Sequence, residues 1–211
     1  MDVSDLRREY RRGRLEIDDL KPDPMEQFER WFQDARDAGV PEPNAMGLAS
    51  CGADSQPSLR TVLMKYFDEH GLVFFTNLES AKAEQMRDNP HVALMFYWQP
   101  LERQVIVRGL SEQVGNAEAL KYFTKRPRGS QLGAWVSDQS RVISSRQVLE
   151  MKLEEIKRKF SEGRVPIPSF WGGYRVRPAE IEFWQGRESR LHDRFLYRLR
   201  DDDWNVDRLA P

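Results

Sequence analysis

The chain has 211 residues, of which 39% are hydrophobic and 32% are charged, and its formal net charge is -1. This length suits one domain with a real core, and the near-neutral charge excludes a general basic field that would draw nucleic acid. Any anion site must therefore be local. A single cysteine, Cys51, excludes an intrachain disulfide and a multi-cysteine metal site. Because no apolar run is long enough for a membrane span or a signal peptide, we expect a cytoplasmic protein.

The first predicted element is an amphipathic helix that begins after Asp23 and ends at Gly39. Asp23 is a good N-cap, Pro24 suits the first helical turn, and the apolar residues that follow have helical spacing. Short β-like runs come next, separated by turn-prone stretches at the spacing of an antiparallel barrel. The predicted strands are Ala45–Ser50, Leu59–Lys65, Leu72–Thr76, Val92–Trp98 and Gln104–Val114.

Helices interrupt this β pattern. We expect short ones over Ser80–Arg87 and from Asn116 to just before Arg126, and a long amphipathic one that starts at Ser144 and that Gly163 closes. Further strands are predicted over Ile181–Gln185, Arg194–Leu199 and Trp204–Arg208. No linker divides the chain, so the sequence predicts a single, mainly β domain with helical insertions, of α+β class, over residues 1–211.

Three groups of residues are candidates for chemistry. In an extended backbone Arg190, His192 and Arg194 share one face, and three converging cations indicate an anion or an electron-rich ring between them. The plain alternative is a solvated basic edge. Two aromatic residues, Phe183 and Trp184, precede this cluster, which favours a planar ligand.

The second group is Tyr122, Arg126 and Ser130, a guanidinium flanked by two hydroxyls that suits a phosphate ester. Its alternative is a stacked surface pair of Tyr122 and Arg126. The third group is the strand that Arg60 and Lys65 bracket; strand parity puts these cations on opposite faces, where they would serve different anions unless a bulge intervenes. The alternative is that the Arg60 and Lys65 side chains bind no anion and simply extend into solvent from the two ends of a barrel strand.

Taken together, these residues resemble the pyridoxine (pyridoxamine) 5′-phosphate oxidase family, and the resemblance runs nearly end to end. It is carried by Leu6-Arg7-Arg8-Glu9-Tyr10, Arg60 to Lys65, Phe75-Thr76-Asn77, Leu101-Glu102-Arg103-Gln104-Val105, Arg126-Pro127, Ser169-Phe170-Trp171-Gly172-Gly173, Glu182-Phe183-Trp184-Gln185-Gly186, Arg190-Leu191-His192-Asp193-Arg194 and Asp207-Arg208-Leu209-Ala210-Pro211. The fold that this resemblance implies is an FMN-binding split β-barrel, and the assembly it implies is a homodimer.

The resemblance also implies ligands for the three groups. FMN would be surrounded by Arg60, Thr61, Val62, Leu63, Met64, Lys65, Phe75, Thr76, Lys82, Gln104, Gln139, Ser140, Trp184 and Arg194. The substrate would be held by Arg7, Arg8, Tyr10, Lys65, Tyr122, Arg126, Ser130, Arg190 and His192, with residues 1–20 as a lid. The catalytic candidates are His192 and Arg194, in a positioning role.

The implied activity is an oxidase of vitamin B6 metabolism. Pyridoxine 5′-phosphate or pyridoxamine 5′-phosphate would lose a hydride from C4′ to the flavin and become pyridoxal 5′-phosphate, while dioxygen would be reduced to hydrogen peroxide. The alternatives are a non-catalytic split-barrel protein that binds FMN or pyridoxal phosphate, and a split-barrel oxidoreductase with another substrate. One residue departs from the family pattern: Ala81 stands where the family usually has an arginine near the FMN phosphate.

Overall fold

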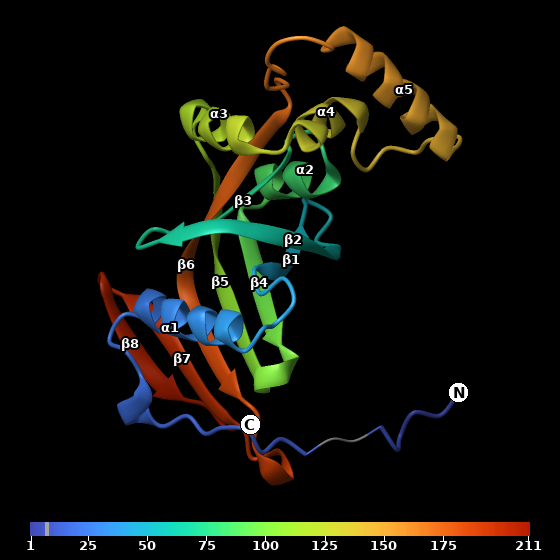
Figure 1. The fold of residues 1–211 in the computed structure, drawn as a ribbon. Coiled ribbons are helices and arrows are strands. Elements are labelled where there is room, and N and C mark those ends of the chain that lie inside the picture. The colour runs from blue at the N-terminus through green and yellow to red at the C-terminus, as the bar shows by residue number, and fades with distance from the viewer. Residues whose placement is uncertain (7–8) are drawn as a thin grey trace.

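The computed structural model describes residues 1–6 and 9–211, and its centre is one antiparallel sheet (Figure 1). The strands are β1 (Ala45–Cys51), β2 (Pro57–Asp68), β3 (Gly71–Asn77), β4 (His91–Trp98), β5 (Arg103–Gln113), β6 (Trp171–Gln185), β7 (Asp193–Arg200) and β8 (Asp203–Arg208). The helices are α1 (Pro24–Asp37), α2 (Ala81–Asp88), α3 (Asn116–Lys125), α4 (Arg128–Val136) and α5 (Arg146–Lys159), with short 3-10 turns at Ile17–Asp19, Gln99–Leu101 and Glu188–Arg190.

Six of the strands close into a barrel. Their order is β3-β2-β1-β4-β5-β6, and β3 also pairs with β6 to complete the circle. Two glycines allow β6 to lie close to both of its barrel neighbours, since a Cβ at Gly71 of β3 or Gly109 of β5 would collide with the carbonyl oxygens of Val176 or Arg177 on β6. Gly71 also has a φ of +129°, which side chains of L-residues rarely adopt.

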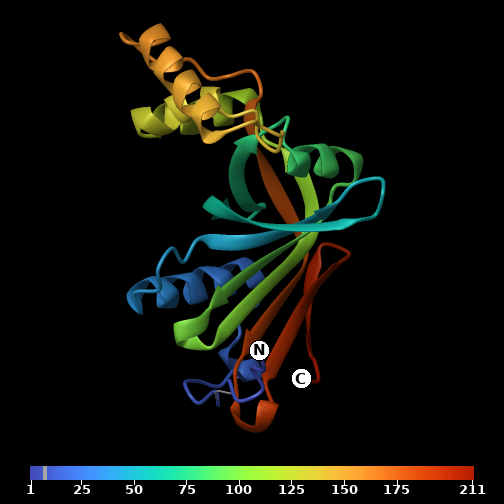
Figure 2. The ribbon, with the colours of Figure 1, turned by 90° about the vertical axis from the view of Figure 1, so that its right-hand side faces the viewer.

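The long strand β6 belongs to two parts of the fold. Its first half pairs with β3, and its second half, from Glu180 onward, pairs with β7. A bulge separates the halves, because Gly109 of β5 pairs with Pro178 while Arg108 pairs with Glu180. Pro178 cannot donate a hydrogen bond to a neighbouring strand, and it lies between the part of β6 that pairs with β3 and the part that pairs with β7. The β7–β8 hairpin therefore extends the sheet beyond the barrel (Figure 2).

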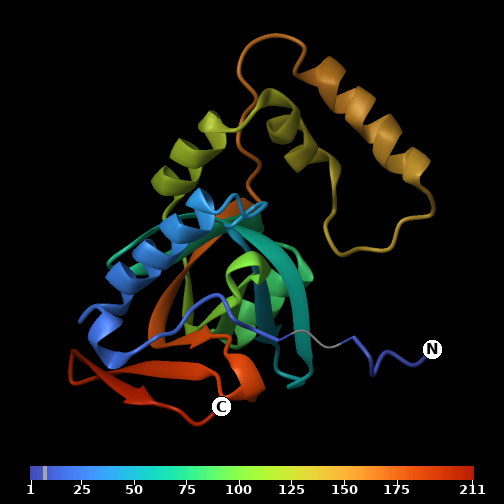
Figure 3. The same ribbon diagram turned by 60° about the horizontal axis from the view of Figure 1, so that its bottom comes forward.

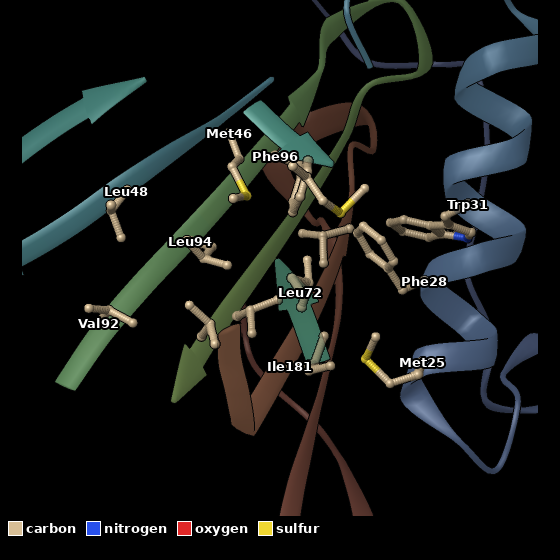
Figure 4. Close-up of a cluster of buried hydrophobic side chains, with 14 of the residues drawn as sticks. Met25, Phe28, Trp31, Met46, Leu48, Leu72, Val92, Leu94, Phe96 and Ile181 are labelled. Carbon is tan, nitrogen blue, oxygen red and sulfur yellow. The ribbon is translucent and has the colours of Figure 1, made fainter. Parts of the chain in front are cut away.

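Helix α1 packs its apolar face against the barrel interior. Asp23 caps it by accepting a hydrogen bond from the Met25 amide at 2.7 Å, and Phe28 and Trp31 are almost completely buried. These side chains meet Leu72, Phe96 and other residues of the barrel strands in one cluster (Figure 4). The burial of such large side chains contributes about 1.5–3 kcal/mol each to stability.

The other helices gather at the opposite end of the barrel from the β7–β8 hairpin (Figures 1 and 2). Of these, α3, α4 and α5 form a second apolar cluster with β3 and β6, which includes Val73, Phe123, Ile156 and Trp171. None of the helices in the described part of the chain is long and apolar enough to span a membrane.

The predicted fold class, mainly β with helical insertions, is confirmed. Two local predictions are wrong. The long helix has Ser145 as its N-cap, not Ser144, and no side-chain cap bond forms there. Strand β6 already begins at Trp171, whereas only its last part, Ile181–Gln185, was predicted as a strand. Helix α4 was not predicted.

Candidate functional site

A cavity of about 680 Å³ lies between the outer face of β2, the end of β3 and the helices above them. Most of the phosphate and flavin candidates from the first half of the chain line it. The lining residues among them are Thr61, Val62, Leu63, Lys65, Phe75, Thr76, Lys82, Tyr122, Arg126, Ser130 and Gln139. The barrel thus brings together three segments that are far apart in the sequence.

Lys82 is a buried cation without a carboxylate partner among the described residues. Its Nζ donates to Gln139 Oε1 at 2.8 Å and to the hydroxyls of Thr76 and Ser80 at 3.2 Å. Burial, and then the nearby charge of Arg60, lower the pKa of Lys82 to about 8. Neutral oxygens satisfy its hydrogen bonds but not its charge, so this position is suited to an anion.

The Arg60 side chain reaches α2, the helix that carries Lys82, and contacts it through Gln85. Its guanidinium donates to Leu48 O at 3.1 Å, to Gln85 Oε1 on α2 at 3.0 Å and to the Ser50 hydroxyl. Burial lowers its pKa. Lys65 lines the cavity with Thr61 and Leu63, whereas Arg60 does not; because Val62, which has the strand parity of Arg60, lines it too, the opposite orientation of Arg60 and Lys65 stays a prediction. The bulge that could have reversed it falls at Lys65 itself, between Met64 and Tyr66.

Arg126 has an unpartnered donor in the cavity wall. Its Nη1 is buried and makes no hydrogen bond with the part of the chain that the structure describes, and burial lowers the pKa of Arg126. The guanidinium carbon lies 5.0 Å from the Trp171 ring centre, so a cation–π contact supports it in part. Arg126 is extended and ends helix α3, because the residue before a proline disfavours helical geometry. Tyr122 lies on α3 and Arg126 caps its end, and both residues line the cavity.

Three parallel rings form one wall of this space. Phe75 stacks on Tyr122 with ring centres 4.2 Å apart and on Trp171 at 5.3 Å. Ser130 lies in the first turn of α4, where its amide donates to Pro127 O at 2.9 Å. Trp171 was not assigned a site role from the sequence; its place in the Ser169 to Gly173 motif was the available signal.

The segment Ser137–Arg141 crosses from α4 to α2. Besides Gln139, its Ser140 hydroxyl accepts from the Ala81 amide at 3.3 Å, and Arg141 pairs with Glu84 of α2 at 2.8 Å. Arg141 therefore brings a cation to α2, the helix on which Ala81 replaces the expected arginine.

The flavin candidate Met64 on β2 points into the barrel core and is 3% exposed, whereas most of the other remaining candidates lie on the second half of the sheet. Gln104, Trp184 and Arg194 are direct neighbours across β5, β6 and β7. Arg194 Nε donates to Glu182 at 2.8 Å, and its Nη1 donates to Ala210 O at 2.9 Å. Glu182 was missed as a site residue, although its alternation with Trp184 places both on one strand face.

His192 and Tyr10 cover Trp184. The ring centres of His192 and Trp184 are 4.6 Å apart, and Tyr10 meets Trp184 edge-on at 5.7 Å. The Arg187 amide donates to His192 Nδ1 at 3.1 Å. Burial, and then the charge of Arg190, lower the pKa of His192, so its neutral form is favoured.

The expected common strand face of Arg190, His192 and Arg194 is wrong for Arg190. Strand β7 begins only at Asp193, and Arg190 ends a 3-10 turn with a φ of +61° after Ser189 at +55°. Such left-handed backbone is costly for non-glycine residues and concentrates at functional sites. Arg7 and Arg8 lie outside the described residues.

A buried carboxylate anchors the N-terminal strap, which we define as residues 9–14. Glu102 is 2% exposed and accepts from the backbone amides of Arg11 and Arg12 at 2.8 and 2.9 Å. These bonds hold the strap beside the β6–β7 end of the sheet (Figure 3). Tyr10 then packs on Gly186, where a Cβ would lie 2.7 Å from the Tyr10 ring.

The two groups of candidates are separated within the chain. Thr61 on β2 and Glu182 on β6 share one row of the ladder but are four strand spacings apart, roughly 19 Å along the sheet. Both lie on the outside of the barrel, where side chains diverge. The cavity lined by Lys82 and Arg126 therefore lacks the Trp184 and Arg194 side of the predicted site.

Comparison with solved structures defines the fold class. A crystal structure of PhzG from Burkholderia lata, in complex with tetrahydrophenazine-1-carboxylic acid, has a TM-score of 0.87 and 28% identity, covering 92% of this chain and 95% of that one. A pyridoxamine 5′-phosphate oxidase-related FMN binding protein from Nostoc punctiforme has a TM-score of 0.73 and 17% identity, covering 91% and 98%. The fold is that of the FMN-binding split barrels.

Sequence comparison identifies the family. The family model for pyridoxamine 5′-phosphate oxidase matches residues 32–160, and the model for the pyridoxine 5′-phosphate oxidase C-terminal dimerisation region matches residues 171–211. A pyridoxine/pyridoxamine 5′-phosphate oxidase of Crocosphaera subtropica is 61% identical over the whole of both chains, and one of Yersinia enterocolitica is 56% identical over all of this chain and 97% of that one. The chain belongs to the pyridoxine/pyridoxamine 5′-phosphate oxidase family.

Proposed function

We propose that the protein is an FMN-dependent oxidase that converts pyridoxine 5′-phosphate or pyridoxamine 5′-phosphate into pyridoxal 5′-phosphate and reduces dioxygen to hydrogen peroxide. The observation that carries this proposal is a single cavity with two positions suited to anions, the buried Lys82 and the unpartnered Nη1 of Arg126. FMN and the substrate each bring one phosphate. The 61% identity to a full-length relative of that name supports this substrate class over other split-barrel substrates.

The residues fit FMN at the Lys82 end. Lys82, Arg60 and the hydroxyl of Thr76 would hold its phosphate, because they supply two cations and a neutral donor around α2. Gln139 Oε1 lies 2.8 Å from Lys82 Nζ in this structure and would yield its place to a phosphate oxygen. When bound, FMN supplies the hydride acceptor for the substrate and the electron donor for dioxygen.

The substrate phosphate would lie at Arg126. Its Nη1 gains the missing acceptor there, while Tyr122, Ser130 and Lys65 complete the cradle from three other segments. His192 would orient the pyridine ring together with Arg190. Because His192 Nδ1 already accepts the Arg187 amide and the neutral form is favoured, its Nε2 is left for the ligand, and we assign it positioning and not obligatory proton transfer.

We further propose that the active unit is a homodimer with each site built from two chains. The outward faces of β2 and β6 each carry one part of the predicted site, and exposed apolar side chains lie between them, with Met95 39% and Tyr97 48% exposed. A two-fold contact of this face with a second copy would bring Arg194 of one chain to the Lys82 cavity of the other. The match of residues 171–211 to a dimerisation region supports this arrangement. A cytoplasmic location is proposed with it.

Oxygen uptake tests the activity. The purified protein is reconstituted with FMN, and oxygen consumption and peroxide formation are measured with pyridoxamine 5′-phosphate and pyridoxine 5′-phosphate. We expect stoichiometric peroxide and pyridoxal 5′-phosphate. A flavin-loaded protein that binds these phosphates without turnover would establish the non-catalytic alternative.

Subunit mixing tests the shared site. Lys65→Ala and Arg194→Ala chains are each assayed at a low substrate concentration, at which each alone has little activity, whereas randomly mixed dimers would leave about a quarter of all sites with both residues intact. We expect activity to return on unfolding and refolding the two together. No recovery, or a flavin-loaded active monomer in ultracentrifugation, would refute the shared site.

A further inference from the structure

Glu182 is a buried carboxylate on the ligand side of the sheet. Its neighbours Ile181 and Phe183 point into the barrel core, so strand alternation turns Glu182 outward beside Trp184. An outward carboxylate is normally solvated, yet this residue is only 3% exposed. Its one ion pair within the described residues is with Arg194, whose Nε donates to Oε1 at 2.8 Å.

Arg194 is fixed from three directions. Besides the bond to Glu182, its Nη1 donates to Ala210 O at 2.9 Å, and its carbonyl oxygen accepts from the Leu209 amide at 2.9 Å. These contacts use the Nε and Nη1 atoms of the guanidinium, and Nη2 makes no hydrogen bond within the described residues and is left for a ligand. A planar guanidinium held at two of its three nitrogens presents the third in one orientation only.

The neighbouring carboxylate shows what an ordinary pair on this strand looks like. Glu180 is on the same face of β6, two residues earlier, and pairs with Arg108 at 3.1 Å and Arg198 at 3.2 Å. Its side chain is 32% exposed, against 3% for Glu182. Exposed pairs contribute little, whereas breaking a buried one leaves an uncompensated charge.

We propose that Glu182 is a positioning residue that holds the Arg194 guanidinium in the orientation in which it meets the flavin and substrate. The inference rests on the proposed function for the identity of that ligand. Glu182 itself touches no ligand in this arrangement and acts through Arg194.

A double-mutant cycle on FMN affinity tests the proposal. The dissociation constant is measured by flavin fluorescence quenching for wild type, Glu182→Gln, Arg194→Gln and the double variant, with Glu180→Gln as the matched control. We expect Glu182→Gln to weaken FMN binding about tenfold, and to have almost no further effect once Arg194 is replaced, because a charged hydrogen bond acts only through its partner. Glu180→Gln should bind FMN like the wild type.

Equal weakening by Glu182→Gln in both backgrounds would overturn the proposal, because it would show a general structural role. So would wild-type affinity in Glu182→Gln. Thermal denaturation of all variants without FMN shows whether any loss follows from unfolding.

A readout without flavin separates this inference from the proposed function. The exchange of the Arg194 Nε proton with water is followed by nitrogen-15 NMR, with the signal assigned through Arg194→Gln. We expect slow exchange in wild type and Glu180→Gln, and fast exchange in Glu182→Gln. Fast exchange in the wild type would refute the positioning role even if FMN binds. Slow exchange in a wild type that binds no FMN would refute the proposed function and retain the Glu182–Arg194 link.

Discussion

The affinity for FMN should depend on pH through Lys82. Replacement by Lys82→Met removes the buried cation while keeping an unbranched side chain of similar length. At about pH 7 we expect the variant to bind FMN much more weakly than wild type, because the phosphate loses a desolvated charged partner. As the pH rises, the advantage of the wild type should shrink, because Lys82 has a pKa of about 8 and loses its charge before an ordinary lysine does.

The size of the change follows from that pKa. Without FMN, Lys82 is about nine-tenths charged near pH 7 and about 3% charged near pH 9.5. If the bound phosphate restores an ordinary lysine pKa, the affinity of the wild type falls roughly 25-fold over this range. In the FMN-free protein, the stability of the wild type relative to Lys82→Met changes with pH in the opposite direction, upward. Its folded pKa lies below the unfolded value of 10.5, so the stability of wild type relative to Lys82→Met rises between about pH 8 and 10.5, by on the order of 3 kcal/mol.

Fluorescence titrations of FMN at closely spaced pH values measure the first effect, and thermal denaturation of the FMN-free proteins measures the second. The Lys82→Met variant corrects for every other group that titrates in this range. Parallel affinity curves for the two proteins, with no convergence toward high pH, would refute the assignment of Lys82 to the phosphate.

Three further predictions concern single residues. Arg126→Ala should raise the KM for pyridoxamine 5′-phosphate by a factor that corresponds to about 1.5–3 kcal/mol, and Lys65→Ala by less because Lys65 is exposed, with FMN nearly retained in both; loss of flavin from both variants would show that this cradle holds the other phosphate. Ala81→Arg should tighten FMN binding by about 0.5–1.5 kcal/mol, more at low salt than at high salt. Unchanged affinity at low salt would indicate that Arg141 already supplies that charge. Glu102→Ala should lower the free energy of unfolding by about 1–3 kcal/mol and speed proteolysis within the N-terminal strap, because two backbone amides lose their acceptor. An unchanged cleavage rate would contradict this anchoring role.

Most of the fold could be predicted from local patterns. Strand β4 alternates buried and exposed residues along its length, and α1 carries its cap and its apolar face in the sequence. Helix α4 escaped prediction because Gly129 and Gly133 weaken the helical signal and tertiary packing has to compensate. The full length of β6 escaped it because Pro178 reads as a strand breaker, and only the change of edge partner makes it acceptable there.

The site could be predicted only in part from the residues themselves. Strand parity predicts opposite orientations of Arg60 and Lys65, but a bulge at Lys65 interrupts the regular alternation there. The orientation of Arg190 could not be predicted, because positive φ values at a serine and an arginine have no sequence signal comparable to glycine. Nor could periodicity show that the cavity lined by Lys82 and Arg126 lies on another part of the barrel surface than Trp184 and its neighbours on β5 and β7.

The close approach of β6 to β3 and β5 sets a limit on engineering this scaffold. A library that randomises the outer strand positions can change side chains freely where they project from the curved surface. At Gly71 and Gly109 no side chain fits without parting β6 from its neighbours. Those two positions should be kept fixed in any redesign toward a new flavin substrate, and so should Gly133, which lines the candidate cavity. Gly129 in α4, where an added Cβ meets open space and which does not line that cavity, is a suitable position for a helix-stabilising replacement.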